Sequence, residues 1–70
     1  MLRPEELKLT LRENGITVHL VTPGTFGTLL VYLEEHLGQW ERAEEVAREL
    51  SDVRSVSFSD TNKTMMFVHT

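Results

Sequence analysis

The spacing of hydrophobic residues changes twice along this chain, and these changes constrain its fold more than any other feature. Apolar residues alternate with polar ones over residues 7–20, recur at helical intervals over residues 26–50, and alternate again over residues 53–59. A period of two is typical of a half-buried β-strand, whereas intervals of three to four residues are typical of an amphipathic helix. The chain is therefore expected to combine strands and helical structure in an α+β fold.

The first alternating region is predicted to be a β-hairpin. Its apolar residues flank the dipeptide Asn14-Gly15 and are Leu7, Leu9, Leu11, Ile16, Val18 and Leu20. Asn-Gly favours the type I′ turn of antiparallel hairpins, because both central residues of that turn have positive φ. The alternative for its first half is a helix that begins at Pro4 and ends at Gly15. We prefer the strand because alternation would leave Leu9 on the wrong side of a helix.

Residues 25–50 are predicted to be helical. Their apolar residues form two stripes that are rotated from each other, and Gly38 lies between the stripes. This pattern indicates one helix kinked at Gly38 or two helices that meet there. Residues 29–33 also fit a buried strand, because short apolar runs are ambiguous. We prefer the helix because residues 34–37 continue its pattern.

The last part of the chain is predicted to form a second hairpin from residues 53–59 and 64–69, joined by a polar turn. The order is then β-hairpin, helical segment, β-hairpin, and an antiparallel sheet of about four strands with the helix on one face gives a two-layer sandwich. The expected core is Leu9, Leu11, Val18, Leu20, Leu30, Leu33, Leu37, Trp40, Val46, Leu50, Val56 and Phe58.

Size and composition restrict what stabilises this fold. Its 70 residues suit one domain over residues 1–70. A core of this size supplies only about 3–5 kcal/mol. The chain has no cysteine and three scattered histidines, so neither a disulfide nor a structural zinc site is expected, and no cofactor is predicted. The stability of the fold must therefore come from packing of the core or from association into a homodimer.

Two features bear on where the protein acts. The first residues lack the apolar stretch of a signal peptide, and no apolar run reaches the length of a membrane span. We expect a cytoplasmic protein with no membrane partner.

The acidic residues of segment 34–52 are the most informative functional feature. This segment has seven acidic residues and two arginines, in a chain of net charge -4. On a continuous helix one side of it would carry Glu34, Glu41, Glu45, Glu49 and Asp52. Like charges four positions apart cost a helix a few tenths of a kcal/mol, about 0.2–0.5 per pair. Such a stripe is expected to meet a basic partner, and the alternative is an ordinary solvated helix face.

A second candidate surface is the sheet face that the helix leaves open. In the predicted hairpin this face carries Lys8, Arg12 and His19, which suits contacts to a phosphate backbone. Nucleic acid is nevertheless an unlikely ligand, because the chain is acidic and the face lacks the aromatic residues on which bases stack. Val21, Met65 or Phe67 on this face would instead suit burial in a dimer.

Two further segments have chemical potential but lack partners in the sequence. A catalytic histidine needs a partner and a pocket, and neither is visible for His19, His36 or His69. Residues 24–28 place two glycines before the predicted helix, where an anion could bind, but an N-cap at Thr25 explains them equally well. No catalytic residue is predicted, and a minimal enzyme or subunit of a shared active site is the remaining alternative.

The expected function is therefore that of a small acidic protein-binding module or inhibitor, possibly of the phage type. It would dock its acidic helical face on a basic surface of a larger protein.

Overall fold

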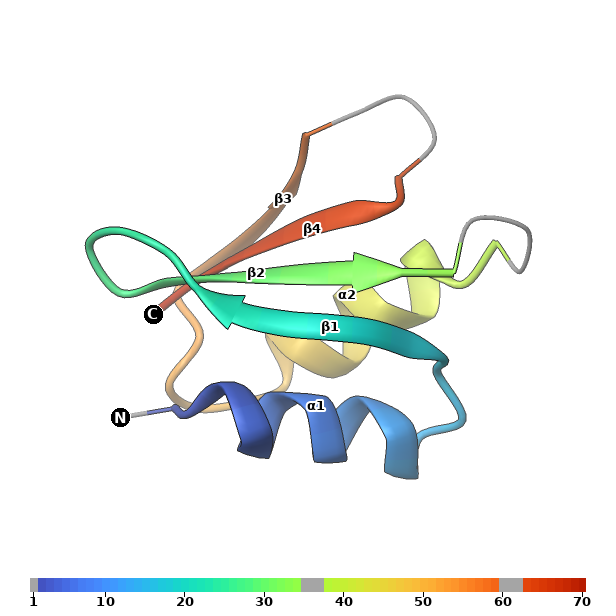
Figure 1. Ribbon diagram of the computed structural model, residues 1–70. Coiled ribbons are helices and arrows are strands. Elements are labelled where there is room, and N and C mark those ends of the chain that lie inside the picture. The colour runs from blue at the N-terminus through green and yellow to red at the C-terminus, as the bar shows by residue number, and fades with distance from the viewer. Residues whose placement is uncertain (1, 35–37, 60–62) are drawn as a thin grey trace.

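The computed structural model describes residues 2–34, 38–59 and 63–70. Within these residues the elements are, in chain order, α1 (Pro4–Glu13), β1 (Val18–Pro23), β2 (Thr28–Leu33), α2 (Trp40–Arg48), β3 (Ser55–Phe58) and β4 (Met65–His69). The strands form one antiparallel sheet in the order β1-β2-β4-β3. Both helices lie on the same face of this sheet (Figure 1). The predicted two-layer α+β arrangement is thus confirmed, as is the order of hairpin, helix and hairpin, with a further helix ahead of it.

The predicted hairpin over residues 7–20 is wrong, because its first half is the helix α1. Pro4 lies at the start of α1, where its fixed φ suits a helix and its missing N–H costs no hydrogen bond. Glu5 and Glu6 in the first turn and Arg12 in the last complement the helix dipole. These terminal signals outweigh the alternation of apolar residues.

The leucines of α1 show how alternation misled the prediction. Leu7 and Leu11, four positions apart, are completely buried against the rest of the core. Leu9 lies between them in sequence and is 59% exposed. Leu9 lies on the solvent side of the helix, as the sequence indicated. One exposed leucine is common in proteins, and the burial of Leu7 and Leu11 stabilises the fold by more than the exposure of Leu9 costs.

Asn14-Gly15 ends α1 instead of turning a hairpin. Gly15 has φ +79, the left-handed conformation that commonly terminates helices. The N–H of Ile16 donates to the carbonyl of Leu11, which closes the helix end and redirects the chain toward β1. An Asn-Gly pair serves both a type I′ turn and a helix C-terminus, because each needs positive φ.

The first hairpin of the sheet is formed by β1 and β2. Its first strand begins at Val18, whereas the sequence predicted a first strand from Leu7. Residues 28–33 are therefore a strand, and the predicted helix over them is wrong. Leu29, Val31 and Leu33 face the helices and are buried, whereas the residues between them face outward. This alternation is the signature of a strand that is covered on one side. The helical pattern resumes at Trp40, and Leu37 lies outside the described residues.

The strands β3 and β4 confirm the two strands predicted within residues 53–59 and 64–69, whereas residues 60–62 of the predicted turn lie outside the described residues. β4 pairs with β3 on one side and with β2 on the other, so it lies inside the sheet. Its buried residues, Met66 and Val68, contribute to the core.

The core lies between the sheet and the two helices. Of the expected core residues, Leu11, Val18, Leu33, Val46 and Val56 are buried, and Leu30, Trp40, Leu50 and Phe58 are partly buried. Leu9 and Leu20 are exposed. The core residues that the sequence analysis did not name are Leu2, Leu7, Ile16, Val21, Leu29, Val31, Ala43, Ala47, Met66 and Val68.

Candidate functional site

The outer side of α2 and the turn that follows it hold most of the predicted acidic residues. Ala43, Val46 and Ala47 anchor α2 on the core, which turns Glu41 and Glu45 to solvent. Glu49 at the end of the helix and Asp52 in the following turn are also exposed. We call residues 40–52 the acidic segment.

Glu34 does not belong to this acidic segment. The continuous helix that would have aligned it with Glu41 does not exist, because residues 28–33 form β2. Its Oε2 instead lies 2.6 Å from His19 Nε2 on the neighbouring strand β1. Glu34 and His19 thus join the two strands of the first hairpin beside the irregularity in their register between Val18 and Leu20.

The charge of the protein is concentrated in the acidic segment. Residues 40–52 hold five carboxylates and two arginines, a balance of −3 in a chain of net charge -4. Arg48 binds Glu44 at 3.0 Å, and Arg42 binds Glu45 at 3.2 Å. In the part of the chain that the structure describes, the remaining carboxylates of the segment, Glu41, Glu49 and Asp52, have no ion pair.

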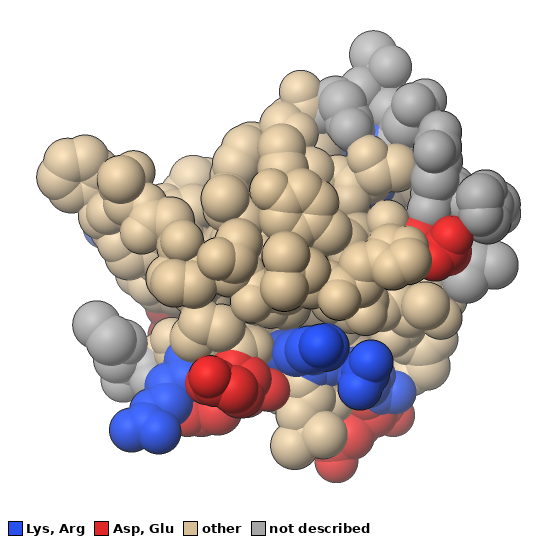
Figure 2. Space-filling view, in the orientation of Figure 1, with Lys and Arg blue, Asp and Glu red and all other residues tan. Residues whose placement is uncertain are grey.

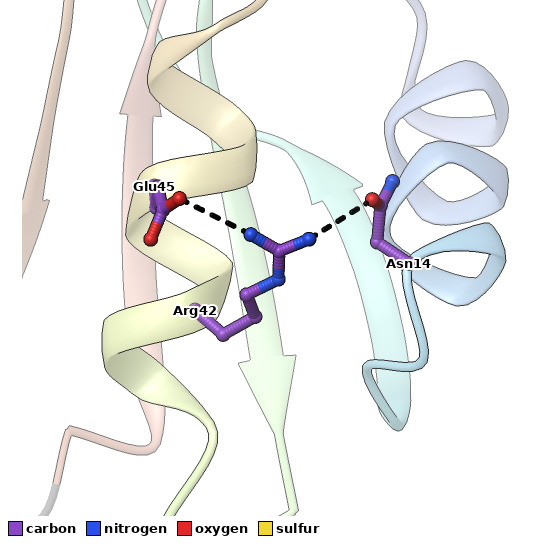
Figure 3. A network of polar contacts seen from close by, with 3 residues as sticks. All are labelled: Asn14, Arg42 and Glu45. Carbon is purple, nitrogen blue, oxygen red and sulfur yellow. Dashed lines mark hydrogen bonds and ion pairs between the residues drawn. The ribbon is translucent and has the colours of Figure 1, made fainter.

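Arg42 also connects the two helices. Figure 3 shows its guanidinium between Glu45 and Asn14, with Nη2 donating to Asn14 Oδ1 at 3.4 Å. Asn14 follows the end of α1, so this arginine links the end of one helix to the outer side of the other. Arg42 therefore pairs with a carboxylate of its own helix and also contacts the residue that follows α1.

A shallow depression lies beside Trp40 in the acidic segment. It has a volume of about 490 Å³ and is lined by Trp40, Glu41, Glu44, Glu45 and Arg48. The partly buried Trp40 ring meets Phe58 edge-on at 5.6 Å between centroids, and Lys63 Nζ lies 5.5 Å from the Trp40 centroid. An aromatic ring among carboxylates suits a lysine or arginine side chain, whose stem packs on the ring while its charge meets the acids.

The three residues proposed to contact nucleic acid were predicted to lie on one sheet face, but the structure separates them. Lys8 and Arg12 belong to α1, on the helix side of the sheet, whereas His19 lies on β1. This prediction is wrong because it depended on residues 7–13 being a strand. The described part of the open sheet side carries neither lysine nor arginine among its strand residues.

That open sheet face is the feature that the sequence analysis described least accurately. Ten strand residues point away from the helices: Leu20, Thr22, Thr28, Leu30, Tyr32, Ser55, Ser57, Met65, Phe67 and His69. None of these ten is Lys, Arg, Asp or Glu. In Figure 2 the charged atoms gather mainly along the bottom of the view, where Figure 1 places α1, and the surface above them is largely uncharged. Met65 and Phe67 lie on this face as expected, but Val21 is buried on the opposite one.

His69 is held by two hydroxyl groups on the open sheet face. Its Nε2 lies 3.1 Å from Ser57 Oγ, and its Nδ1 lies 3.3 Å from Thr28 Oγ1. A serine beside a histidine resembles a nucleophile with its base. Here, however, the second ring nitrogen meets a threonine and not the carboxylate that stabilises an imidazolium in hydrolytic triads. The arrangement explains the orientation of the ring, and we assign it no catalytic role.

Residues 24–27 form the turn between β1 and β2 and do not precede a helix, so neither an anion site at a helix N-terminus nor an N-cap at Thr25 is present there. The turn is closed by the N–H of Gly24, which donates to the carbonyl of Thr28 at 2.6 Å. Phe26 has φ 54, a left-handed conformation that is uncommon for an aromatic residue, and its side chain is fully exposed.

No group of three or more histidine or carboxylate side chains is placed to hold a metal ion in residues 2–34, 38–59 and 63–70. Over the same ranges no helix has the length and apolar character needed to cross a membrane.

No protein-family model matches this sequence, and neither the curated proteins nor the solved structures include a significant match.

Proposed function

We propose that this protein is a small protein-binding module that captures a basic segment of a larger protein with its acidic segment. The observation that carries the proposal is that three carboxylates, on Glu41, Glu44 and Glu45, and a single arginine line a depression beside one partly exposed tryptophan. The partner side chains would be lysines or arginines that enter the depression beside Trp40. If the basic segment belongs to a functional surface of the partner, binding inhibits that partner.

Electrostatics would set the rate and selectivity of this capture. Glu41, Glu49 and Asp52 have no intramolecular ion pair in the described chain, so their charge is available to an incoming cation. A concentrated charge of one sign accelerates association with the opposite sign and weakens as salt is added. Ion pairs formed at such an exposed site add little affinity by themselves, about 0–1 kcal/mol each.

Trp40 supplies what the carboxylates lack. Tryptophan and arginine are enriched among the residues that dominate binding energy at interfaces. The Trp40 ring is already positioned by Phe58 and Lys63, so little conformational freedom is lost when a partner packs on it. Lys63 also shows that this aromatic pair accepts a cation from within the chain itself.

We also infer that this capture takes place in the cytoplasm. A chain of this size without cysteine relies on packing and needs no oxidising compartment to complete its fold.

The test uses the fact that Trp40 is the sole tryptophan of the chain, so its fluorescence reports on the proposed site without a label. Titration with a lysine- and arginine-rich peptide should change Trp40 emission, and added salt should weaken binding. The double substitution Glu41→Lys and Glu45→Lys should abolish the response.

The matched control makes the same change of charge on α1, through Glu6→Lys and Glu13→Lys. Both glutamates are exposed and lie outside the acidic segment. The control should bind the peptide with only a small loss of affinity. Equal losses in both variants would show that net charge alone attracts the peptide, and absence of binding at low salt would reject the proposal.

A further inference from the structure

The open sheet face has an apolar centre with a rim of hydroxyl groups. The strand register places Leu20, Tyr32 and Met65 in one row across three strands, and Leu30 and Phe67 side by side in the next. Leu20 is 51% exposed and Tyr32 is 36% exposed. Helices cover the other face of the sheet, whereas in the described chain no element covers this one (Figure 1).

A hollow and a projecting side chain occur together at one end of this face. The hollow has a volume of about 540 Å³ and is lined by Gly24, Thr25, Thr28, Leu30, Phe67 and His69. Phe26 is in the same turn as Gly24 and Thr25, but its side chain is 102% exposed and does not fill the hollow. Its positive φ holds it away from the strand conformation of its neighbours.

We propose that the open sheet face is the contact between two copies of this chain, with Phe26 of each copy seated in the hollow of the other. A twofold interface uses the same patch on both subunits, so each patch must hold a projection and the recess that receives it. The turn between β1 and β2 and the adjoining sheet supply both.

Charge favours a second copy over a different partner. Two acidic chains repel each other, and they repel most where their acidic segments meet. The ten outward residues of the open sheet face carry no formal charge apart from that of a protonated His69, so two copies can approach there without opposing carboxylates. A basic partner would find no counter-charge on these residues.

The size of the face sets the strength of the dimer. Four strands about 4.8 Å apart and about five residues long give a face of roughly 20 × 20 Å with side chains included. Burial of Phe26 adds about 150–250 Å² from each copy. The total reaches the lower end of the range for stable interfaces, about 1,200 Å². We therefore expect a dimer that forms at micromolar concentration.

This inference does not depend on the proposed function. The acidic segment is on the helix side of the sheet, so it stays exposed in the dimer. Peptide binding at Trp40 and self-association can each succeed or fail alone.

Sedimentation equilibrium of the whole chain, from low micromolar to millimolar concentration, tests the proposal. The unmodified protein should show a reversible monomer–dimer equilibrium. Phe26→Ser and, separately, Tyr32→Asp should each weaken it by about tenfold or more in Kd. Tyr32 is informative because β2 is paired on both sides, so its substitution affects the face and no free strand edge.

The matched control is Leu9→Asp, which removes an exposed leucine from α1, and circular dichroism confirms that every variant is folded. Leu9 is 59% exposed and should not affect the dimer. A protein that stays monomeric at millimolar concentration overturns the proposal. So does a dimer that survives both Phe26→Ser and Tyr32→Asp, or one that Leu9→Asp weakens equally.

Discussion

Gln39 is hydrogen-bonded to Thr17 across the chain, because its Oε1 accepts the backbone N–H of Thr17 at 2.8 Å. The Nε2 of the same side chain donates to the carbonyl of Gly15 at 3.3 Å. Gln39 directly precedes α2, and Gly15 and Thr17 lie in the link from α1 to β1. One side chain therefore provides hydrogen-bond partners for two backbone groups of a link that is part of neither a helix nor a strand.

Replacement of the partly buried Gln39 should lower stability. Gln39→Ala removes both hydrogen bonds and is expected to lower the free energy of unfolding by about 1–2 kcal/mol. Gln39→Glu should also destabilise the fold, because the substituted side chain keeps an acceptor for Thr17 but opposes the carbonyl of Gly15. Urea denaturation measures both, with Ser51→Ala as an exposed control that should stay within about 0.5 kcal/mol of the unmodified protein.

The leucines of α1 give a direct test of helix against strand. Leu11→Ala leaves a cavity at a fully buried site and should cost about 2–5 kcal/mol. Leu9→Ala should change stability by no more than about 0.5 kcal/mol, since Leu9 is exposed. In the hairpin that alternation suggests, the two leucines would share a buried face and both substitutions would be severe. Comparable losses in denaturation experiments would therefore contradict the helix.

Gly15 should resist replacement although it has space around it. A Cβ at this position would meet no atom within 4 Å, so no clash is expected. Its φ of +79 still disfavours any L-residue. Gly15→Ala is therefore expected to destabilise the protein by about 1 kcal/mol, and Gly15→Asn by less, because asparagine tolerates this conformation. A stabilised Gly15→Ala variant in thermal denaturation would be incompatible with the end of α1 described above.

The Arg42 network should contribute little to stability. Both of its contacts are at the surface, and exposed ion pairs of this kind are worth about 0.2–1 kcal/mol. Arg42→Ala should fall within that range and should make the acidic segment more negative. Peptide affinity at Trp40 is then expected to rise slightly at low salt, and the fluorescence titration measures this change. A marked fall in affinity would place Arg42 in the binding contact itself.

The architecture could be predicted where the sequence pattern had only one physical explanation. Residues 53–59 alternate, and the strands predicted within residues 53–59 and 64–69 are present as β3 and β4. The prediction was wrong where two local signals competed. Asn14-Gly15 satisfies a hairpin turn and a helix end alike, and the decision depended on Pro4 and the first-turn acids.

The prediction for residues 28–33 was wrong for a different reason. Leu-Leu-Val-Tyr-Leu follows a period of two or of three to four equally well in so short a run. Only the pairing partners decide the outcome, and Val31 is opposite Val21 on one side and Met66 on the other. Met66 is distant in sequence, so no local pattern reveals its pairing with Val31.

The same limit applied to the candidate surfaces. Glu41, Glu45, Glu49 and Asp52 could be grouped from their spacing because the helical pattern of residues 40–50 was recognised. Glu34 was added to them through a helix that does not exist. The residues of the open sheet face could not be predicted correctly from the sequence, because the register between β1, β2 and β4 decides which residues lie next to one another on it.

The position of β4 between β2 and β3 has a consequence for the time course of folding. During translation the first hairpin, α2 and β3 all leave the ribosome before residues 65–69. Until those residues emerge, β2 and β3 each present an unpaired hydrogen-bonding edge, and such edges invite intermolecular association. The missing pairs between β2 and β4 link distant parts of the chain, which slows their formation. We therefore expect a nascent chain that stays incompletely structured and reaches its native state in one late step, when its sixth element is inserted into the sheet.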